Sequence, residues 1–170
     1  MNFLKNIYVW TLKKAEHKNA KWYLSLISFA ESSFFPIPPD ILLIPMALAS
    51  KTKALLYAFI CTLSSVLGGV FGYAIGYFFF NSVGLYIVEF YHLENSFNIF
   101  ENYYKEFGIL IVLGAGITPF PYKFITIASG VFGLNIFLFI IVSIIGRGLR
   151  FYLIAILLYF FGEKIKLIID

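Results

Sequence analysis

The chain has 170 residues, of which 61% are hydrophobic and only 13% are charged, and its formal net charge is +4. A soluble domain carries about 25% charged residues, so this composition argues against a soluble globular protein and predicts an integral membrane protein. The single cysteine excludes an internal disulfide and a tetrathiolate metal site. Residues 54 to 88 and 124 to 146 contain no charged residue, and about 20 apolar residues suffice to cross a bilayer.

The first 21 residues form a basic segment in which apolar residues recur at helical spacing. The apolar residues include Phe3 and Ile7, and the basic residues include Lys5 and Lys13. This pattern is typical of an amphipathic helix in the headgroup region of a membrane, or equally of a basic tail that only sets membrane topology. The basic residues of the chain flank apolar segments, so we expect no nucleic acid as a partner.

All prolines of the chain fall in two short segments, which contain the motifs FFPIPPD and TPFPYK. Proline lacks an amide donor and restricts φ, so neither motif fits inside a straight helix. Broken backbone survives at membrane depth only where protein or a cavity satisfies its polar groups. We therefore predict re-entrant hairpins over 32 to 50 and 117 to 132, with a proline-kinked spanning helix as the alternative. The prolines are Pro36, Pro38, Pro39, Pro45, Pro119 and Pro121.

Two long apolar segments follow the proline motifs, at about 54 to 80 and 135 to 161, and each is predicted to span the membrane. In the first, Gly68, Gly72 and Gly76 share one helix face and allow close approach of another element. Between the spans, an amphipathic pattern predicts an interfacial helix on the outer face within the linker 81 to 107.

The two proline motifs align when the second half of the chain is shifted by 83 residues. Pro36 then falls on Pro119, Pro38 on Pro121, and Asp40 on Lys123. Each half is a hairpin followed by one spanning helix, so the fold class is an all-α membrane protein built as an inverted repeat. The predicted divisions are 1–21, one membrane domain over 22–161 with halves 22–80 and 108–161, and a basic tail over 162–170.

Five ionisable residues lie within or beside the apolar segments, and their charges sum to one excess positive charge. We expect the basic members to bind phosphate, because arginine presents a planar fork that matches phosphate geometry. We expect the acidic members to form ion pairs or to exchange protons, because burial disfavours a charged carboxylate. Alternatively, all five only stabilise the fold, or the arginines are interfacial anchors. The residues are Glu31, Asp40, Lys123, Arg147 and Arg150.

These features, in this order, resemble the DedA family, whose core is also called the VTT or SNARE-associated domain. The stretches PFPYK and GRGLRF resemble its short YqaA-like branch. The resemblance covers residues 22 to 161. It implies a bacterial inner-membrane protein that moves undecaprenyl phosphate or phospholipid, with protons as candidate coupling ions. By position, Glu31 and Asp40 match the acidic pair of the family, and Lys123 matches the arginine of its second hairpin. GAGITP lacks the further arginine that the better-known branch carries there.

The sequence thus predicts a lipid flippase or scramblase with both termini in the cytoplasm, whose lipid tail stays in the bilayer between the hairpins. It predicts no cofactor and no metal, and it leaves a homo-oligomer open. Enzymatic activity is not expected, because no histidine lies near the hairpins to activate Ser32 or Ser33. Two other functions remain: a proton-coupled transporter or channel for a small soluble anion, and a membrane scaffold without transport.

Overall fold

The structure is a computed structural model that describes residues 19–34 and 37–169, and within these ranges the chain is all-helical. The predicted N-terminal helix lies, up to residue 18, outside the described residues, as does Pro36. The helices are α2 (Ala20–Ser33), α3 (Asp40–Ala49), η1 (Lys51–Lys53), α4 (Ala54–Phe79), η2 (Phe80–Gly84), α5 (Leu85–Phe90), α6 (Glu94–Ile117), α7 (Tyr122–Val131) and α8 (Ile136–Ile169).

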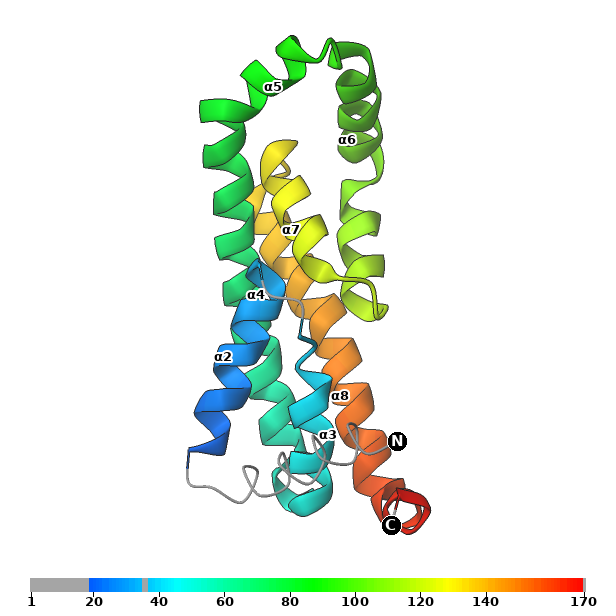
Figure 1. Cartoon of the computed structure of the whole chain (residues 1–170). Helices are drawn as coiled ribbons and strands as arrows, with labels where there is room; N and C mark the ends of the chain where they lie inside the picture. Colours follow the sequence, from blue (N-terminus) through cyan, green and yellow to red (C-terminus); the bar gives the residue numbers. More distant parts are fainter. Residues whose placement is uncertain (1–18, 35–36, 170) are drawn as a thin grey trace.

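The first proline motif is the tip of a helical hairpin. The helix α2 rises from one end of the molecule to its middle, and α3 returns to the same end (Figure 1). Proline suits the position just before a helix, because its fixed φ is already helical, and Pro39 stands immediately before α3. The arm of this hairpin begins at Ala20, not at residue 32, so the predicted bounds were too short. In the structure α2 and α3 are two arms that run in opposite directions rather than one kinked helix (Figure 1).

The second proline motif is the tip of another hairpin, which comes from the opposite end (Figure 1). Its arms are α6 and α7, and Pro121 stands immediately before α7. The predicted boundary at 107 falls inside α6, which runs unbroken from Glu94 to Ile117. The boundary at 80 likewise falls inside a longer helical segment, in which η2 and α5 directly follow α4.

Two helical segments are long and apolar enough to cross a membrane. They are Lys51–Phe90, with 40 residues, and Ile136–Gly162, with 27 residues. The start of the second agrees with the sequence: the Asn135 side chain accepts hydrogen bonds from the amides of Phe137 and Leu138, at 3.0 and 3.2 Å, as a helix N-cap does. The helix α8 continues to Ile169, so the predicted basic tail, up to that residue, is its last part.

The two hairpins pack on the long helices in a reciprocal way. The helix α2 packs on α4 and α3 on α8, whereas α6 packs on α8 and α7 on α4. Adding 83 to the bounds of α2, α3 and α4 reproduces the C-terminal end of α6 and the starts of α7 and α8 to within one residue. The middle of the molecule is therefore the place where both tips meet.

Glycines on one face of α4 make this packing close. A Cβ atom on Gly68 would come within 2.9 Å of the Phe29 Cα atom in α2, and one on Gly76 within 2.9 Å of the Ile127 carbonyl carbon in α7. Gly72 lies between them, against the Thr126 side chain. A missing side chain lets helix backbones approach closely, so α4 carries both hairpins on one glycine face.

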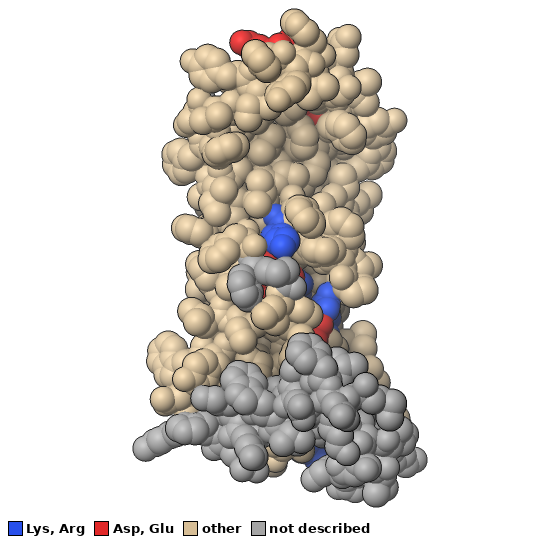
Figure 2. All heavy atoms as spheres, in the orientation of Figure 1, with Lys and Arg blue, Asp and Glu red and all other residues tan. Residues whose placement is uncertain are grey.

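Two apolar clusters lie on either side of this middle region. One joins α2, α3, α4 and α8 and contains Leu24, Leu43 and Phe151. The other joins α6, α7 and α8 and contains Val112 and Phe139. Outside these clusters many large apolar side chains are exposed, and Figure 2 shows a face on which charged atoms gather mainly at mid-height and at one end.

Candidate functional site

A cavity of about 180 Å³ lies where the two proline tips meet. Both tips and α8 contribute to its wall, which combines prolines and aromatic rings with charges of both signs. The cavity therefore offers an apolar frame around a few charged groups, as ligand sites commonly do. The lining residues are Glu31, Pro38, Pro119, Phe120, Pro121, Lys123, Phe124 and Arg150.

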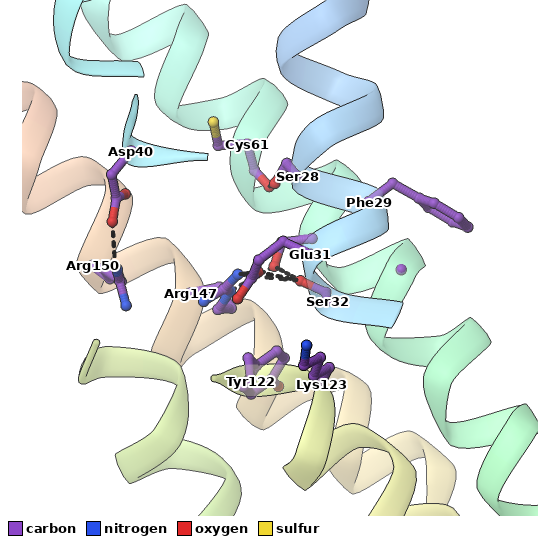
Figure 3. Close-up of polar contacts among 12 residues, drawn as sticks. Ser28, Phe29, Glu31, Ser32, Asp40, Cys61, Tyr122, Lys123, Arg147 and Arg150 are labelled. Atoms are coloured by element: carbon purple, nitrogen blue, oxygen red, sulfur yellow. Dashed lines mark hydrogen bonds and ion pairs between the residues drawn. The ribbon is translucent and has the colours of Figure 1, made fainter. Parts of the chain in front are cut away.

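Behind this cavity, Arg147 is buried in the protein with only 1% of its surface exposed. Its guanidinium forms an ion pair with Glu31 and donates hydrogen bonds to the hydroxyls of Ser65 (2.5 Å) and Ser32 (3.1 Å) (Figure 3). A buried charge is tolerated when it is paired and hydrogen-bonded. The sequence interpretation that Arg147 is buried rather than an interfacial anchor therefore agrees with the structure.

The hydroxyls around Arg147 form a directed chain. Ser32 donates to the Glu31 carboxylate at 3.0 Å, and the oxygens of Ser32 and Ser65 are 2.6 Å apart. Each serine has one proton to donate, so Ser65 donates to Ser32 and its oxygen accepts from Arg147. The network thus orients the Glu31 carboxylate from two sides and joins α2, α4 and α8.

Aromatic rings enclose the same guanidinium. The Arg147 Cζ atom lies 4.7 Å from the centre of the Tyr122 ring and 5.0 Å from that of Phe151. Tyr122 is buried and its hydroxyl lies 2.5 Å from the Ser143 hydroxyl. An arginine against aromatic faces gains cation–π attraction. Because the Arg147 guanidinium is enclosed in this way and does not line the cavity, the structure favours a framework role for it over phosphate binding.

The second acid–base pair joins the first hairpin to α8 and to the second tip. Arg150 forms an ion pair with Asp40 (Figure 3) and donates a hydrogen bond to the Thr118 carbonyl oxygen at 2.6 Å. The other carboxylate oxygen of Asp40 is buried and has no hydrogen-bond partner among the described residues. Asp40 therefore holds Arg150 at the edge of the cavity through one carboxylate oxygen, while its other oxygen accepts no hydrogen bond from the described residues.

Lys123 differs from both arginines. Within the part of the chain that the structure describes, its ammonium forms no ion pair, and its recorded contact is with the Phe124 ring, 5.3 Å from the ring centre. It is partly exposed and lines the cavity. Since Glu31 and Asp40 are each paired with an arginine, Lys123 supplies the one uncompensated positive charge of the five-residue group.

The sequence did not single out the hydroxyl residues that join the two tips. The Thr126 hydroxyl donates to the Ser32 carbonyl oxygen at 3.0 Å, which links α7 to α2. From the sequence, Ser32 is considered only as a candidate nucleophile, although hydroxyls within apolar helices are a recognised signal of interhelical hydrogen bonding. No group of three or more His, Cys, Asp or Glu that could hold a metal lies in the described residues.

Two bacterial proteins match nearly the whole chain. A Haemophilus influenzae protein described as uncharacterized is 37% identical over 164 residues, which cover 96% of this chain and 85% of that protein. A Histophilus somni protein, described as a homologue of an uncharacterized protein, is 35% identical over the same coverage. The chain belongs to this uncharacterized family. No family model matches it, and no solved structure matches it significantly.

Proposed function

We propose that this chain is an integral membrane protein in which α4 and α8 cross the bilayer. Two helical segments have sufficient length and apolar character, and many large apolar side chains lie on the surface. Soluble monomers rarely expose contiguous apolar patches larger than a few hundred Å². The face in Figure 2, whose charged atoms lie mostly at mid-height and at one end, supports the same placement.

In this placement the two hairpins enter from opposite faces and end near the midplane, as an inverted repeat of re-entrant elements. The reciprocal packing of the hairpins on α4 and α8 supports that arrangement. The end where α2 begins carries Lys21, Lys51 and Lys53, whereas the α5–α6 end carries Glu89 and Glu94. Positively charged ends face the cytoplasm, so α2 would begin and α8 would end on the cytoplasmic side of a bacterial inner membrane.

We infer that the cavity between the tips binds the phosphate headgroup of a lipid, which the protein moves across the bilayer. The observation that carries this inference is Lys123, a cation with no ion-pair partner among the described residues, on the wall of a small cavity at the meeting point of the tips. An ionisable residue at membrane depth is costly and usually serves a pathway or pairs with another charge. Arg150 supplies a second cation on the same wall, and Asp40 restrains it.

The DedA-like order of the motifs supports the same function, with Glu31 and Asp40 in the positions of the family's acidic pair. In this proposal Glu31 and Asp40 modulate binding through the ion pairs that hold Arg147 and Arg150. Arg147, held by Glu31 and two serines, maintains the shape of the cavity.

The test is lipid translocation by purified protein in proteoliposomes. Labelled polyprenyl phosphate and labelled phospholipid are assayed separately, with and without a pH gradient. We expect transport by the wild type, loss of transport in Lys123→Ala, and no loss in Lys105→Ala, whose lysine lies on the surface of α6 in an ion pair with Glu101. A folded wild-type protein that moves neither lipid refutes the proposal, and uptake of free phosphate would assign the cavity to a soluble anion instead.

A further inference from the structure

An apolar groove adjoins the charged cavity, between the tip of the second hairpin and α8. Its volume is about 380 Å³. We propose that this groove holds the hydrocarbon tail of the lipid whose phosphate occupies the cavity, an inference that rests on the proposed function. The groove is lined by Ile117, Pro119, Leu149, Arg150, Leu153 and Ile154.

The groove and the cavity are neighbours that share two wall residues. Pro119 and Arg150 line both. Arg150 places its guanidinium against Asp40 and the Thr118 carbonyl oxygen, while its stem reaches back to α8. Long cationic side chains commonly lay their methylene stems along apolar surface and keep the charged head in a polar place. Arg150 therefore stands at the boundary between a charged compartment and an apolar one.

The charged cavity and the apolar groove beside it match the two parts of a phosphate-headed lipid. The cavity provides the ammonium of Lys123 and the guanidinium of Arg150, whereas Arg150 is the one charged residue of the groove wall among the described residues. A soluble anion would gain nothing from an apolar extension of the site. A lipid can use both parts of the site, because its tail meets apolar surroundings in the groove as it does in the bilayer.

This path differs from the one that the sequence predicts, in which the tail lies between the two hairpins. The space between the tips is occupied by charged and hydrogen-bonded groups, among them the bond from Thr126 to Ser32. The groove lies to the side of the second tip instead, and Leu149 and Leu153 on its wall are exposed. In a bilayer, a tail in this groove would reach the surrounding lipid sideways.

A second apolar hollow on α8 provides an internal control. It is lined by Ile144, Ile145, Gly148, Leu149, Tyr152, Leu153 and Ile156, all from α8. It shares Leu149 and Leu153 with the groove but contains neither a tip residue nor a charged residue. Lipid tails of the bilayer should contact this hollow whatever headgroup they carry. The groove, in contrast, should select the lipid whose phosphate binds in the cavity.

The experiment compares two photoactivatable probes with identical tails that carry a diazirine. One is a phosphatidic acid and the other is a diacylglycerol, which lacks phosphate. Each is reconstituted with the full-length protein, irradiated, and located by mass spectrometry. We expect labelling of Ile117 by the phosphatidic acid to exceed labelling by the diacylglycerol about tenfold, and to fall about tenfold in Lys123→Ala, since a charge-assisted contact contributes at least this factor. Labelling of Ile145 should be equal in all three cases.

A matched pair of variants tests the groove without touching a charge. Ile117→Trp fills the groove, and Ile145→Trp places the same bulk on the hollow; the two isoleucines are similarly exposed, at 42% and 49%. We expect the first variant alone to lose phosphate-dependent labelling at Ile154, which lines the groove and not the hollow. Equal labelling of Ile117 by both probes overturns the proposal. Phosphate-dependent labelling in a protein that moves no lipid supports the groove and refutes translocation, so the two failures are distinguishable.

Discussion

The ion pair between Glu31 and Arg147 is the feature whose loss should destabilise this protein most. Glu31→Gln keeps the size of the side chain and removes the negative charge. Arg147, with 1% of its surface exposed, would then remain buried as a cation with only serine hydroxyls and two aromatic faces around it. Solvent cannot compensate for the missing carboxylate at such a depth.

Removing one partner of a buried ion pair costs about 3–5 kcal/mol, because the other charge stays behind uncompensated. In a domain of 150–250 residues, 1 kcal/mol shifts the melting temperature by about 2–4 °C. We therefore expect Glu31→Gln to lower the Tm by roughly 6–20 °C. The surface pair between Lys105 and Glu101, in which Lys105 is 62% exposed, provides the control, since such pairs contribute about 0–1 kcal/mol.

The assay uses the single cysteine of the chain. Cys61 is fully buried on α4, next to the Ser28 hydroxyl that donates to its carbonyl oxygen at 2.7 Å. A thiol-reactive dye that fluoresces on coupling therefore reports unfolding of purified protein in detergent as the temperature rises. No engineered label is required, and every variant carries the same reporter.

A double-mutant cycle decides whether the pairing itself is responsible. Glu31→Gln and Arg147→Met are measured singly and together, and the double variant should recover a large part of the loss, because no charge is left unpaired. If Glu31→Gln melts at the wild-type temperature, or if the two losses simply add, the pair does not stabilise the fold in the way described.

Three further predictions concern packing, a helix cap and the second ion pair. Gly72→Leu should separate α4 from Thr126 and lower the Tm strongly, whereas Gly114→Ala, where nothing lies within 4 Å of the added atom, should leave it unchanged or slightly raised; equal effects would contradict the packing argument. Asn135→Ala removes the cap of α8 and should cost about 1 kcal/mol, seen as a Tm lower by a few degrees and restored by Asn135→Asp. Asp40→Asn should lower the Tm less than Glu31→Gln does, because Arg150 keeps its hydrogen bond to the Thr118 carbonyl oxygen; the same dye assay compares the two.

The extents of the two hairpins show why some elements were misjudged from sequence. The arm α2 resembles a short apolar piece, because serines interrupt its hydrophobic pattern. In the structure those serines face α4: Ser28 donates to the Cys61 carbonyl oxygen and Ser33 to that of Gly68, at 2.7 and 2.9 Å. Apolar periodicity alone cannot detect a helix face whose contacts are hydrogen bonds.

The arm α6 was divided for a related reason. Its first half is amphipathic and its second half is apolar, so the sequence suggested an end near 107. In the structure the helix continues to Ile117, because α6 packs on α8. Gly116 lies against Gly146, and a Cβ atom added to Gly116 would lie 3.1 Å from the Gly146 Cα atom. A helix whose surroundings change along its length shows a change in its hydrophobic pattern, and a helix that ends there would show the same change.

The sequence by itself determined the composition typical of a membrane protein, the two proline breaks and the start of α8 at Asn135, because each depends on the local chemistry of a few consecutive residues. Only the tertiary structure decided how the charges combine. Glu31 pairs with Arg147 and Asp40 with Arg150, 116 and 110 residues away along the chain, and among the described residues Lys123 alone of the five is left without an ion-pair partner. Any acid in the group is an equally good partner for any base at the level of sequence, and the packing of α2, α3 and α7 on α4 and α8 selects which of them meet.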